Sequence, residues 1–492
     1  MYDPIFIGID IGTQGTKAVL CNKNGDVLFE AFCKSNLIQP DSKTIYENPD
    51  DIFNSVITTI KELTQKAGDD SKRIHSICID AQMAGIMAID ENFEAVTPLD
   101  SWLDSRCKHY TSLLQKEAGD EAIQCSGGQI IHSHASKILW WKNEEKDTYK
   151  RIKKFVMPNA YVAGKLCGLT HEDAFMDYTF LHFNIFSDNK NLHYNESLLK
   201  LFNVDLDKLP KIVSPTDIIG TISPYFSKVM GLPGGVSVLA GCGDTAASSI
   251  GAGITKKGVA YDVAGTASVF ACATDKFVPD TKHKTLLFSR SILKDLYLPL
   301  SYINGGGLCL SWFSELTGKS FNELNASVRE NPSIDTPIFI PHFQGRLFPI
   351  NNNIEGAFLG LNFNTNFTAM YKAVMESIAF EYNYYLSILK DTNSVTDNLK
   401  IIGVGGGAKS DVFAQIKADV LNCSYIVPQS IDSAPVACAL LASHKAGYNE
   451  ENLSDVFSKR TSQTKEYSPN NDEHQKYKPI YNKYLTLLDR LT

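Results

Sequence analysis

The sequence predicts an α/β protein built from two domains. Its 492 residues are more than one hydrophobic core usually serves. Two stretches, 5–21 and 258–273, each read as a strand, a turn containing Gly and Thr, and a second strand. We therefore expect duplicated α/β domains that face one another, 1–250 and 251–492. Because strand–turn–strand pieces are common in unrelated proteins, a chance repetition is the alternative.

The first eighty residues predict the element order β-β-β-α-β. Short apolar runs predict strands at 5–10, 17–21, 27–32 and 74–80. The turn 22–26 contains an Asn-Gly pair, which is a strong hairpin signal between two strands. Residues 48–50 (Asn-Pro-Asp) mark a helix start, and the apolar residues within 52–63 recur with helical spacing. The chain therefore opens with a β-meander, which a helix follows.

Composition and charge exclude several classes of partner. The net charge is −8 and no basic stripe stands out, so nucleic acid and anionic membranes are not expected partners. Eleven cysteines are scattered singly without a C-x-x-C pair, which argues against a disulfide framework or a zinc site. The N-terminus reads as a strand and not as a signal peptide, and no apolar run reaches about 18 residues. We expect a cytoplasmic protein without a membrane segment, and whether it forms a homodimer is left open.

A Gly-rich turn after the first strand suits phosphate binding. Glycines in the run 12–17 (Gly-Thr-Gln-Gly-Thr-Lys) let the backbone approach an anion, and successive N–H groups form a nest. Asp10 at the strand's end can hold Mg²⁺ through water, because Mg²⁺ keeps several waters and takes few carboxylates. The alternative is a plain hairpin with polar turn residues.

Three further Gly-rich segments differ in what they can bind. Residues 403–408 match the dinucleotide fingerprint G-x-G-x-x-A, but they lie near the C-terminal end of the chain. Because glycines before a helix N-terminus bind any phosphate, this segment also suits ATP. Residues 253–258 lack the Gly-Lys-Ser/Thr ending of a P-loop, so we reject them as a phosphate cradle. Residues 304–307 (Asn-Gly-Gly-Gly) either approach a nucleotide or merely form a turn.

Asp244 begins a predicted helix of small residues after the apolar strand 235–240. The dipole of a helix favours the charged form of a carboxylate at its N-terminus, so we expect Asp244 to be ionised near neutral pH. Small residues behind it allow another backbone to pack closely, as at a site where two domains meet. Asp244 is therefore a candidate catalytic base, and the alternative is that it only caps the helix.

Five motifs along nearly the whole chain together resemble one family. They are Asp10-Ile-Gly-Thr-Gln-Gly-Thr-Lys17, Ala81-Gln-Met-Ala-Gly85, Trp102-Leu-Asp-Ser-Arg106, Gly241-Cys-Gly-Asp244 and Gly405-Gly-Gly-Ala-Lys-Ser410. Residues 356–361 and 371–376 also resemble that family's second signature. Each motif alone is weak, but five in the family's order are specific. The sequence resembles the FGGY carbohydrate kinases, which include xylulokinases, ribulokinases, gluconokinases and glycerol kinases.

This resemblance implies two actin-like ATPase (ribonuclease H-like) domains flanking a deep cleft. Sugar would bind to the N-terminal domain and ATP mainly to the C-terminal domain, with Asp244 as the catalytic base and Asp10 holding Mg²⁺. The implied nucleotide-contacting residues are Gly12, Thr13, Gln14, Lys17, Gly265, Thr266, Gly307, Ser311, Gly406, Gly407, Ala408 and Asp411. The implied sugar-contacting residues are Gln82, Met83, Trp102, Asp104 and Asp244, with His132 as a further candidate.

The chain departs from the family's pattern where the sugar is read. Xylulokinases usually carry Met-His-Gly where this chain has residues 83–85 (Met-Ala-Gly), so Ala84 replaces a sugar-contacting histidine. The Arg-Glu pair of glycerol kinases is absent as well. In the first signature, His132 and His134 stand where the family has other residues, although 137–140 fits. We expect D-xylulose to be a mediocre substrate and a related ketose or a polyol to be preferred.

Simpler interpretations exist for the residues of the predicted sugar pocket. Met83 and Trp102 can be ordinary core residues, because buried methionine and tryptophan need no ligand. Asp104 and Arg106 can form a surface ion pair, and His132 can be structural.

Two rival functions come from other classes of protein. A non-catalytic or chaperone-like actin-fold ATPase that binds a protein partner would need neither a sugar pocket nor an acid at position 244. A nicotinamide-dependent dehydrogenase rests on residues 403–408 alone and leaves the motifs at 10–17 and 241–244 unexplained. The sequence therefore favours an ATP-dependent sugar kinase.

Overall fold

The computed structural model describes residues 3–265, 267–351, 353–392, 394–395, 399–449, 451–460 and 464–491. The chain packs into two compact units. Unit 1 contains Met1–Gly253, Phe288–Leu296 and Asp432–Arg460, and unit 2 contains Ile254–Leu287, Tyr297–Ile431 and Thr461–Thr492. The chain thus returns to unit 1 twice after first leaving it. The predicted assignment of 1–250 to sugar binding and of 251–492 to nucleotide binding stays a prediction.

Unit 1 is built on a mixed sheet with the strand order β13-β14-β5-β1-β2-β3, and β15 also pairs with β5. The strands are β1 (Ile5–Gly12), β2 (Gly15–Asn22), β3 (Val27–Lys34), β5 (Ile74–Ala81), β13 (Ile218–Thr221), β14 (Ser237–Leu239) and β15 (Cys242–Gly243). β1 runs antiparallel to β2 and parallel to β5, and β2 runs antiparallel to β3. The predicted β-meander is confirmed.

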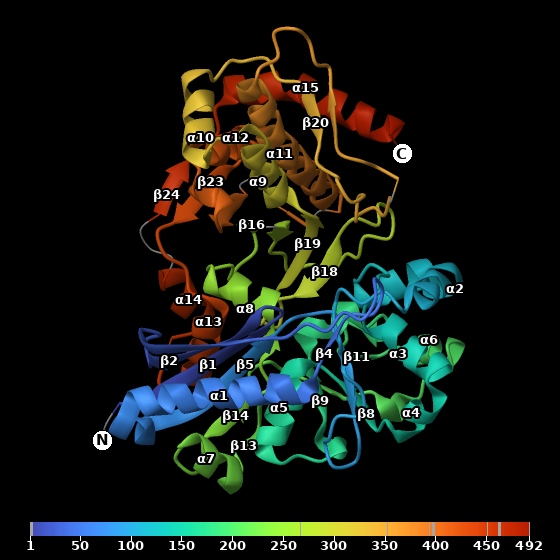
Figure 1. The fold of residues 1–492 in the computed structure, drawn as a ribbon, viewed down its shortest axis with the longest axis vertical. Coiled ribbons are helices and arrows are strands. Elements are labelled where there is room, and N and C mark those ends of the chain that lie inside the picture. The colour runs from blue at the N-terminus through green and yellow to red at the C-terminus, as the bar shows by residue number, and fades with distance from the viewer. Residues whose placement is uncertain are drawn as a thin grey trace. The chain divides into compact units, whose positions relative to one another are not determined.

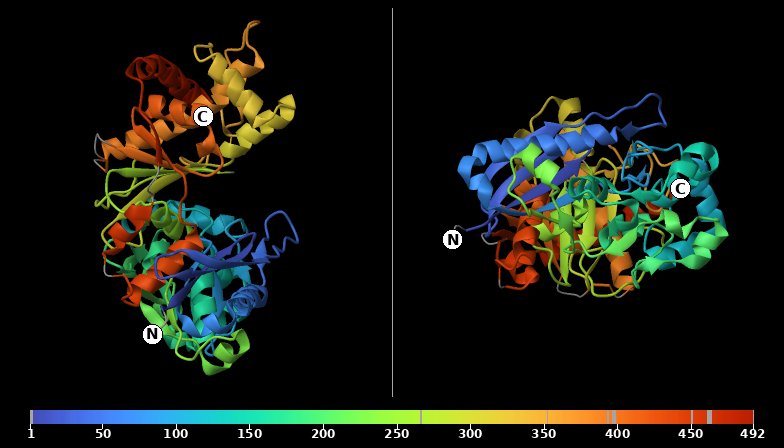
Figure 2. Two further views of the ribbon diagram at one scale, coloured as in Figure 1. Left: turned by 90° about the vertical axis from the view of Figure 1, so that its left-hand side faces the viewer. Right: turned by 90° about the horizontal axis from the view of Figure 1, so that it is seen from below.

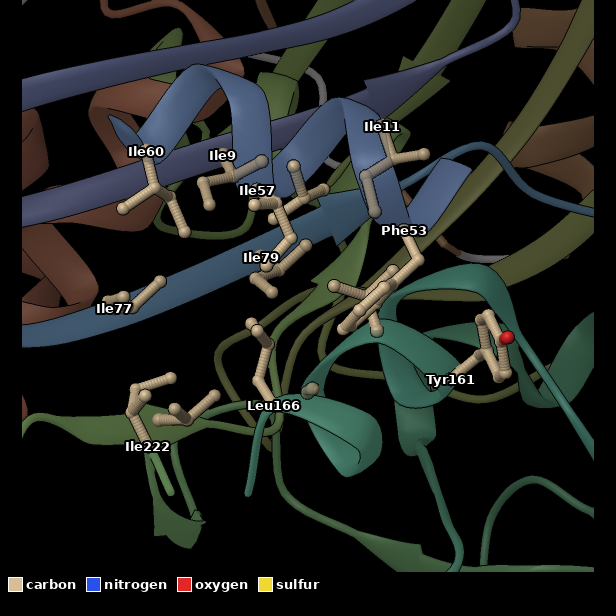
Figure 3. Packing of buried hydrophobic residues seen from close by; sticks show 14 of the residues in the cluster. Ile9, Ile11, Phe53, Ile57, Ile60, Ile77, Ile79, Tyr161, Leu166 and Ile222 are labelled. Atoms are coloured by element: carbon tan, nitrogen blue, oxygen red, sulfur yellow. The ribbon is translucent and has the colours of Figure 1, made fainter. Parts of the chain in front are cut away.

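One face of this sheet packs against two helices. α1 (Pro49–Ala67) begins where the Asn-Pro-Asp motif predicted, because the side chain of Asn48 accepts a hydrogen bond from the N–H of Asp50. Isoleucines of β1 and β5 meet apolar side chains of α1 and α5 (Pro158–Cys167) (Figure 3). Burying one such side chain contributes roughly 1.5–3 kcal/mol, so this layer fixes both helices on the sheet.

The opposite face of the sheet carries α8 (Asp244–Gly251) and α13 (Ala434–Lys445). α13 comes from late in the chain, yet it lies along β1 (Figures 1 and 2). α13 and β1 approach each other closely because β1 has a glycine at the contact. A Cβ on Gly8 would lie 1.7 Å from the carbonyl oxygen of Pro435. Since side chains alternate along a strand, Asp10 projects from the same face as Gly8. The acid of the first strand and the start of α8 therefore share one face.

The rest of unit 1 consists of helices and short two-stranded sheets. The helices are α2 (Lys108–Ser126), α3 (His134–Glu144), α4 (Lys146–Arg151), α6 (Glu196–Leu201), α7 (Pro224–Met230) and α14 (Leu453–Arg460). The short sheets pair β4 (Tyr46–Glu47) with β7 (Leu99–Asp100), β6 (Met87–Ile89) with β8 (Lys154–Val156), β9 (Phe175–Asp177) with β12 (Lys211–Val213), and β10 (Ser187–Asp188) with β11 (His193–Tyr194). β6 and β7 adjoin the loops that carry the residues predicted to contact sugar.

Unit 2 is built on a second mixed sheet, in which its strands have the order β19-β17-β16-β22-β23-β24. The strands are β16 (Val259–Ala264), β17 (Ser268–Cys272), β19 (Tyr297–Ile303), β22 (Lys400–Val404), β23 (Ser424–Pro428) and β24 (Thr464–Tyr467). A further strand, β18 (Leu287–Arg290), consists mainly of residues that belong to unit 1. The remaining elements are α9 (Gly306–Thr317), α10 (Phe321–Glu330), α11 (Phe367–Asp391), α12 (Asp411–Leu421), α15 (Asn471–Arg490) and the pair β20 (Ile338–Ile340) and β21 (Ala357–Leu359).

The two sheets repeat one topology. In unit 2, β16 is antiparallel to β17 and parallel to β22, as β1 is to β2 and β5 in unit 1. The match extends to the next two strands. In unit 2, β22 is parallel to β23, which is antiparallel to β24. In unit 1, β5 is likewise parallel to β14, which is antiparallel to β13. The predicted duplication of α/β domains is therefore confirmed.

Two further features concern the helices. The helix that follows the glycines of 403–408 begins only at Asp411, because a 3₁₀ turn occupies Gly407–Lys409 and the hydroxyl of Ser410 caps α12 by accepting from the N–H of Phe413. Within the described part of the chain, every helix is too short or too polar to cross a membrane.

Candidate active site

Two carboxylates lie side by side on neighbouring strands of unit 1. Asp10 on β1 and Asp80 on β5 are register partners in the parallel pairing, so both project from the face that carries α8. Asp80 is fully buried, and its Oδ2 accepts a hydrogen bond from Cys438 Sγ at 3.3 Å. Burial, and then the charges of Asp10 and Asp244, raise the pKa of Asp80 well above its ordinary value. The protonated form of Asp80 that this favours can donate to Asp10, whose pKa burial also raises.

Asp244 is the first residue of α8, and Gly243 occupies the N-cap position. Oδ1 of Asp244 accepts hydrogen bonds from the N–H and the hydroxyl of Thr245, at 2.6 and 3.2 Å. Within the described residues, both hydrogen bonds to this carboxylate fall on Oδ1, which leaves Oδ2 open to a ligand. Because Gly243 holds the N-cap position, the alternative that Asp244 is the N-cap is wrong, although its carboxylate accepts from an N–H of the first turn.

The environment of Asp244 changes its acidity. Burial, and then the charge of Asp10, raise the pKa of Asp244 to about 7, although the hydrogen bonds from Thr245 oppose the rise. Asp244 is therefore only partly ionised near neutral pH, where the helix N-terminus was expected to keep it ionised, because desolvation outweighs the dipole. A carboxylate whose pKa lies near the working pH is well matched to general base catalysis.

The backbone that leads into Asp244 is held by buried polar groups. The N–H of Gly243 donates to the hydroxyl of Thr179 at 2.9 Å, and that hydroxyl donates to Oδ1 of Asp177. The side chain of Met83 lies against Gly243, where a Cβ would come within 2.4 Å of Met83 Cε. Glycine at position 243 therefore lets Met83, a predicted sugar contact, reach the start of α8.

The predicted phosphate turn joins β1 to β2 through the two residues Thr13 and Gln14. Gly12 and Thr13 are half-buried, whereas the side chain of Gln14 is exposed. Nζ of Lys17 lies 3.8 Å from Glu30 Oε2, and both side chains are substantially exposed, so this ion pair is weak. The turn therefore offers backbone N–H groups, and the strand that follows it carries the weakly paired ammonium group of Lys17.

Three predicted site residues are joined by hydrogen bonds. Trp102 Nε1 donates to Thr13 Oγ1 at 3.1 Å, and Thr13 Oγ1 donates to Gln82 Oε1 at 3.1 Å. Gln82 is buried, but Trp102 is 49% exposed. The interpretation of Trp102 as a core residue is therefore wrong: its indole N–H is held while its ring stays accessible.

Asp104 organises the loop that contains it. Its Oδ2 accepts from the N–H of Ile45 and from Arg106 Nε, both at 2.8 Å, and its Oδ1 accepts from the N–H of Arg106. Arg106 also forms an ion pair with Asp100 at 2.6 Å. The alternative of an ion pair between Asp104 and Arg106 is thus correct, but Asp104 is buried, so the pair does not lie on the surface. Its carboxylate already serves protein donors, and its contact with sugar stays a prediction.

A buried lysine, Lys137, donates a hydrogen bond to the backbone at Ala84. Ala84 has a left-handed φ of 59°, and its carbonyl accepts from Lys137 Nζ at 3.0 Å. Lys137 also donates to the Ser101 carbonyl at 2.7 Å.

Nδ1 of His132 lies 2.8 Å from Thr111 Oγ1, and burial lowers the pKa of His132, which favours the neutral imidazole. A sugar contact by His132 stays a prediction.

A cavity of about 520 Å³ lies in unit 2. Five residues predicted to contact the nucleotide line it: Gly265, Gly307, Ser311, Gly406 and Gly407. Its other lining residues include Ser268, Phe321, Asn325, Tyr371, Met375, Lys409 and Phe413. The volume lies within the range of about 300–1,000 Å³ that is usual for small-molecule sites. Glycine backbones beside aromatic side chains can accommodate a phosphate chain and a planar base.

Two of the nucleotide contacts predicted within 251–492 do not line this cavity. Ala408 is buried in the 3₁₀ turn and is not a lining residue. Asp411 also does not line the cavity, and its Oδ1 lies 2.7 Å from Arg329. Thr266 lies outside the described residues.

Sequence reasoning missed several residues that the structure brings to these sites. Asp80 carried one signal, its place at the end of a predicted strand, which has meaning only once that strand is paired with β1. Phe321 and Asn325 lie on α10 and belong to no motif, so only the tertiary structure places them. Tyr371 lies on α11 within the second-signature segment 371–376, which predicted no nucleotide contact.

The residues around Asp10 fit a Mg²⁺ ion that is held mainly by phosphate and water. Among the described residues, no group of three or more His, Cys, Asp and Glu side chains is arranged to hold a metal. Mg²⁺ does not need such a group, because it commonly takes one or two carboxylates together with substrate phosphates and waters. Asp10, next to the phosphate turn, can supply one carboxylate.

Comparisons with known proteins agree with this arrangement. Residues 5–251 match the FGGY family of carbohydrate kinases, N-terminal domain, and residues 260–446 match the C-terminal domain of that family. The gluconokinase of Bacillus subtilis is 28% identical and the xylulose kinase of that species 25% identical, with 98% and 97% of this chain covered and 95% of each relative.

Solved structures share the fold. The ligand-bound xylulose kinase from Lactobacillus acidophilus has a TM-score of 0.88 at 24% identity, with 99% of this chain and 98% of that one covered. The gluconate kinase from Lactobacillus acidophilus has a TM-score of 0.89 at 24% identity, with 100% and 98% covered. The predicted actin-like ATPase fold is confirmed. The chain belongs to the FGGY family of carbohydrate kinases and is a phosphotransferase that uses ATP and a sugar.

Proposed function

We propose that this kinase transfers the γ-phosphoryl group of ATP to a hydroxyl of a small neutral sugar, with Asp244 as general base. The observation that carries the proposal is the carboxylate of Asp244, which has one oxygen open to a ligand and a pKa of about 7. An alcohol attacks a phosphoryl group faster when a positioned base accepts its proton. Oδ2 of Asp244 is the atom suited to accept it.

Asp10 and Asp80 set the charge around that base. Repulsion from Asp10 makes Asp244 a better proton acceptor than an ordinary aspartate. The protonated form of Asp80 limits the negative charge of the three carboxylates. Mg²⁺, if bound, would neutralise charge on the phosphates of ATP, and Asp10 is the residue that we propose would hold it.

The nucleotide is proposed to occupy the cavity of unit 2. Gly406 and Gly407 follow β22, where backbone N–H groups can meet phosphate oxygens. Phe321, Tyr371 and Met375 supply the apolar wall against which an adenine ring can pack.

The acceptor is proposed to be a ketose or a polyol, although relatives named gluconokinase and xylulose kinase are similarly distant. The carboxylate of an aldonate such as gluconate would be bound most strongly by a cation. Lys137 and Arg106 are already engaged, the first by two backbone carbonyls and the second by Asp100 and Asp104. These contacts favour an uncharged acceptor.

An ADP-release screen tests the proposal. The panel comprises D-xylulose, other ketopentoses, ketohexoses, polyols and aldonates including gluconate, each with ATP and Mg²⁺, and Asp244→Asn serves as the inactive control. We expect the highest kcat/KM with a ketose or polyol other than D-xylulose. A maximum with gluconate would contradict the neutral acceptor. ATP binding without phosphorylation of any sugar would instead favour the non-catalytic actin-fold ATPase.

A further inference from the structure

A chain of side-chain hydrogen bonds in unit 1 ends at Glu47, a residue without a role in the proposed function. The chain runs from the indole of Trp102 to the hydroxyl of Thr13 and on to the amide oxygen of Gln82. Gln82 Nε2 then donates to Glu47 Oε1 at 2.6 Å, which is shorter than the two preceding bonds of 3.1 Å. Four segments that are distant in the sequence are thereby linked.

The two ends of this chain fix the direction of every bond in it. An indole nitrogen can only donate, and an ionised carboxylate can only accept. Because Thr13 Oγ1 accepts from Trp102, its single proton is available for Gln82. Because Gln82 accepts through its oxygen, its NH₂ group faces Glu47. The orientation of the amide therefore depends on an acceptor at position 47.

Glu47 is suited to be that acceptor. It lies on β4, which pairs with β7, and it is 1% exposed. In the part of the chain that the structure describes, no basic side chain forms an ion pair with it, and its hydrogen-bond donor is Gln82. An amide bond to an ionised carboxylate is stronger than one to a neutral acceptor. Burial raises the pKa of Glu47 to about 7 while the bond from Gln82 lowers it, so Glu47 is mostly ionised at pH 8.

We propose that Glu47 is a positioning residue whose carboxylate orients the amide of Gln82 and, through it, the hydroxyl of Thr13 and the indole of Trp102. The inference rests on the proposed function, in which Gln82 and Trp102 meet the sugar and Thr13 belongs to the phosphate turn. One buried acid then aligns groups on the sugar side and on the phosphate side of unit 1. Glu47 itself contacts neither ligand.

Glu47→Gln is the informative substitution, because it keeps the size of the side chain and adds an NH₂ group where the chain of hydrogen bonds needs an acceptor. The amide of Gln82 can then turn over and offer its own NH₂ group to Thr13. The hydroxyl would receive two donors, and its proton would point elsewhere. We expect kcat/KM for the sugar to fall about 10- to 100-fold at pH 8, as for other hydrogen bonds to charged groups, while ATP still binds.

A spectroscopic readout separates positioning from a general loss of stability. The chain has four tryptophans, so 5-fluorotryptophan gives four ¹⁹F signals, and Trp102→Phe assigns the one of interest. Glu47→Gln is expected to move the Trp102 signal in the ligand-free protein. The matched control Ile60→Val removes one methyl group from the buried face of α1 and is expected to change neither that signal nor kcat/KM.

A double-mutant cycle tests whether Glu47 acts through Gln82. We expect Glu47→Gln combined with Gln82→Met to lose no more activity than Gln82→Met alone. If Glu47→Gln does not fold, Glu47→Asp withdraws the charge by one methylene group and is also expected to move the Trp102 signal. An unmoved Trp102 signal in a folded variant, or additive losses in the cycle, would overturn the role of Glu47. The ¹⁹F measurement needs no substrate, so a failed sugar screen would overturn the proposed function alone.

Discussion

At the scale of single residues, three aspartates in unit 1 have unlike environments, and the differences match different roles. Asp80 is fully buried, and its pKa lies well above that of a free aspartate. Asp244 is half-buried with a pKa of about 7, and the pKa of Asp10 is also raised by burial. Carboxyl groups whose pKa values are pushed apart can act as acid, base and metal ligand at the same pH.

Asp10→Ala should remove the carboxylate that we propose for Mg²⁺. Mg²⁺-dependent activity is expected to fall strongly, whereas binding of nucleotide without Mg²⁺ stays close to that of the wild type, because the cavity of unit 2 is unchanged. Titrations of activity against Mg²⁺ and of nucleotide affinity without the metal measure the two effects. Asp70→Ala, which removes an exposed acid paired with Arg73, is the control for net charge. Unchanged Mg²⁺ dependence in Asp10→Ala would mean that Asp10 is only a strand-end acid.

Ala84→His should shift specificity towards D-xylulose. The substitution restores the imidazole that xylulokinases usually carry, and a buried polar group discriminates strongly between sugars that do and do not pair with it. The left-handed backbone at Ala84 is less restrictive for His than for bulky apolar residues. The ratio of kcat/KM for D-xylulose to that for the preferred sugar should rise. A wild-type enzyme that already prefers D-xylulose to every other sugar would contradict a role of Ala84 in specificity.

At the scale of elements, local signals predicted the strands and the start of α1 well. The Asn-Pro-Asp motif and the Asn-Gly turn act within a few residues, so their effects can be read without knowing the fold. The pairing of β1 with β5, the packing of α13 on β1 and the bond between Glu47 and Gln82 join segments that are distant in the sequence. Such contacts depend on the whole fold, and for this reason Asp80 and Glu47 could not be recognised from the sequence.

Gly8→Ala tests the contact between β1 and α13. A Cβ at this position would lie 1.7 Å from the Pro435 carbonyl oxygen, so the helix or the strand must move. We expect a loss of stability of at least the roughly 1–3 kcal/mol that is typical of overpacking. Thermal unfolding measures it, with Gly119→Ala as the control. Gly119 lies within α2 with open space around it, and Ala there should stabilise the protein by about 0.5–1 kcal/mol. Equal melting temperatures for Gly8→Ala and the wild type would contradict the described packing.

At the scale of the whole molecule, the sequence predicted a duplicated α/β architecture, and the two sheets indeed repeat strand order and direction. It did not predict that Asp432–Arg460 belongs to unit 1. Hydrophobic spacing predicts that a segment is a helix with a buried face, but it does not specify the sheet on which that face is buried. A division at residue 250 therefore follows the order of the sequence, whereas each of the two compact units combines three separate segments of it.

We expect the protein to change shape when it binds both the sugar and the nucleotide. Phosphoryl transfer requires the acceptor hydroxyl within about 3–3.5 Å of the γ-phosphate, whereas we propose that sugar and nucleotide bind to different units. Kinases commonly close around their ligands to achieve this and to exclude water. In small-angle scattering, the protein with both the sugar and a non-hydrolysable ATP analogue bound should have a smaller radius of gyration than the protein with only one of these ligands bound. An unchanged radius, with both ligands shown to be bound, would contradict closure.

The pH dependence of kcat/KM in the wild type and in Asp244→Asn tests the central claim most directly. If Asp244 is the base, kcat/KM for the preferred sugar should fall as the pH drops through about 7, because protonation removes the acceptor. Asp244→Asn should lower turnover by roughly 10²–10⁴-fold and abolish this acid limb, while ATP binding persists. Near wild-type turnover in a folded Asp244→Asn protein would contradict the account.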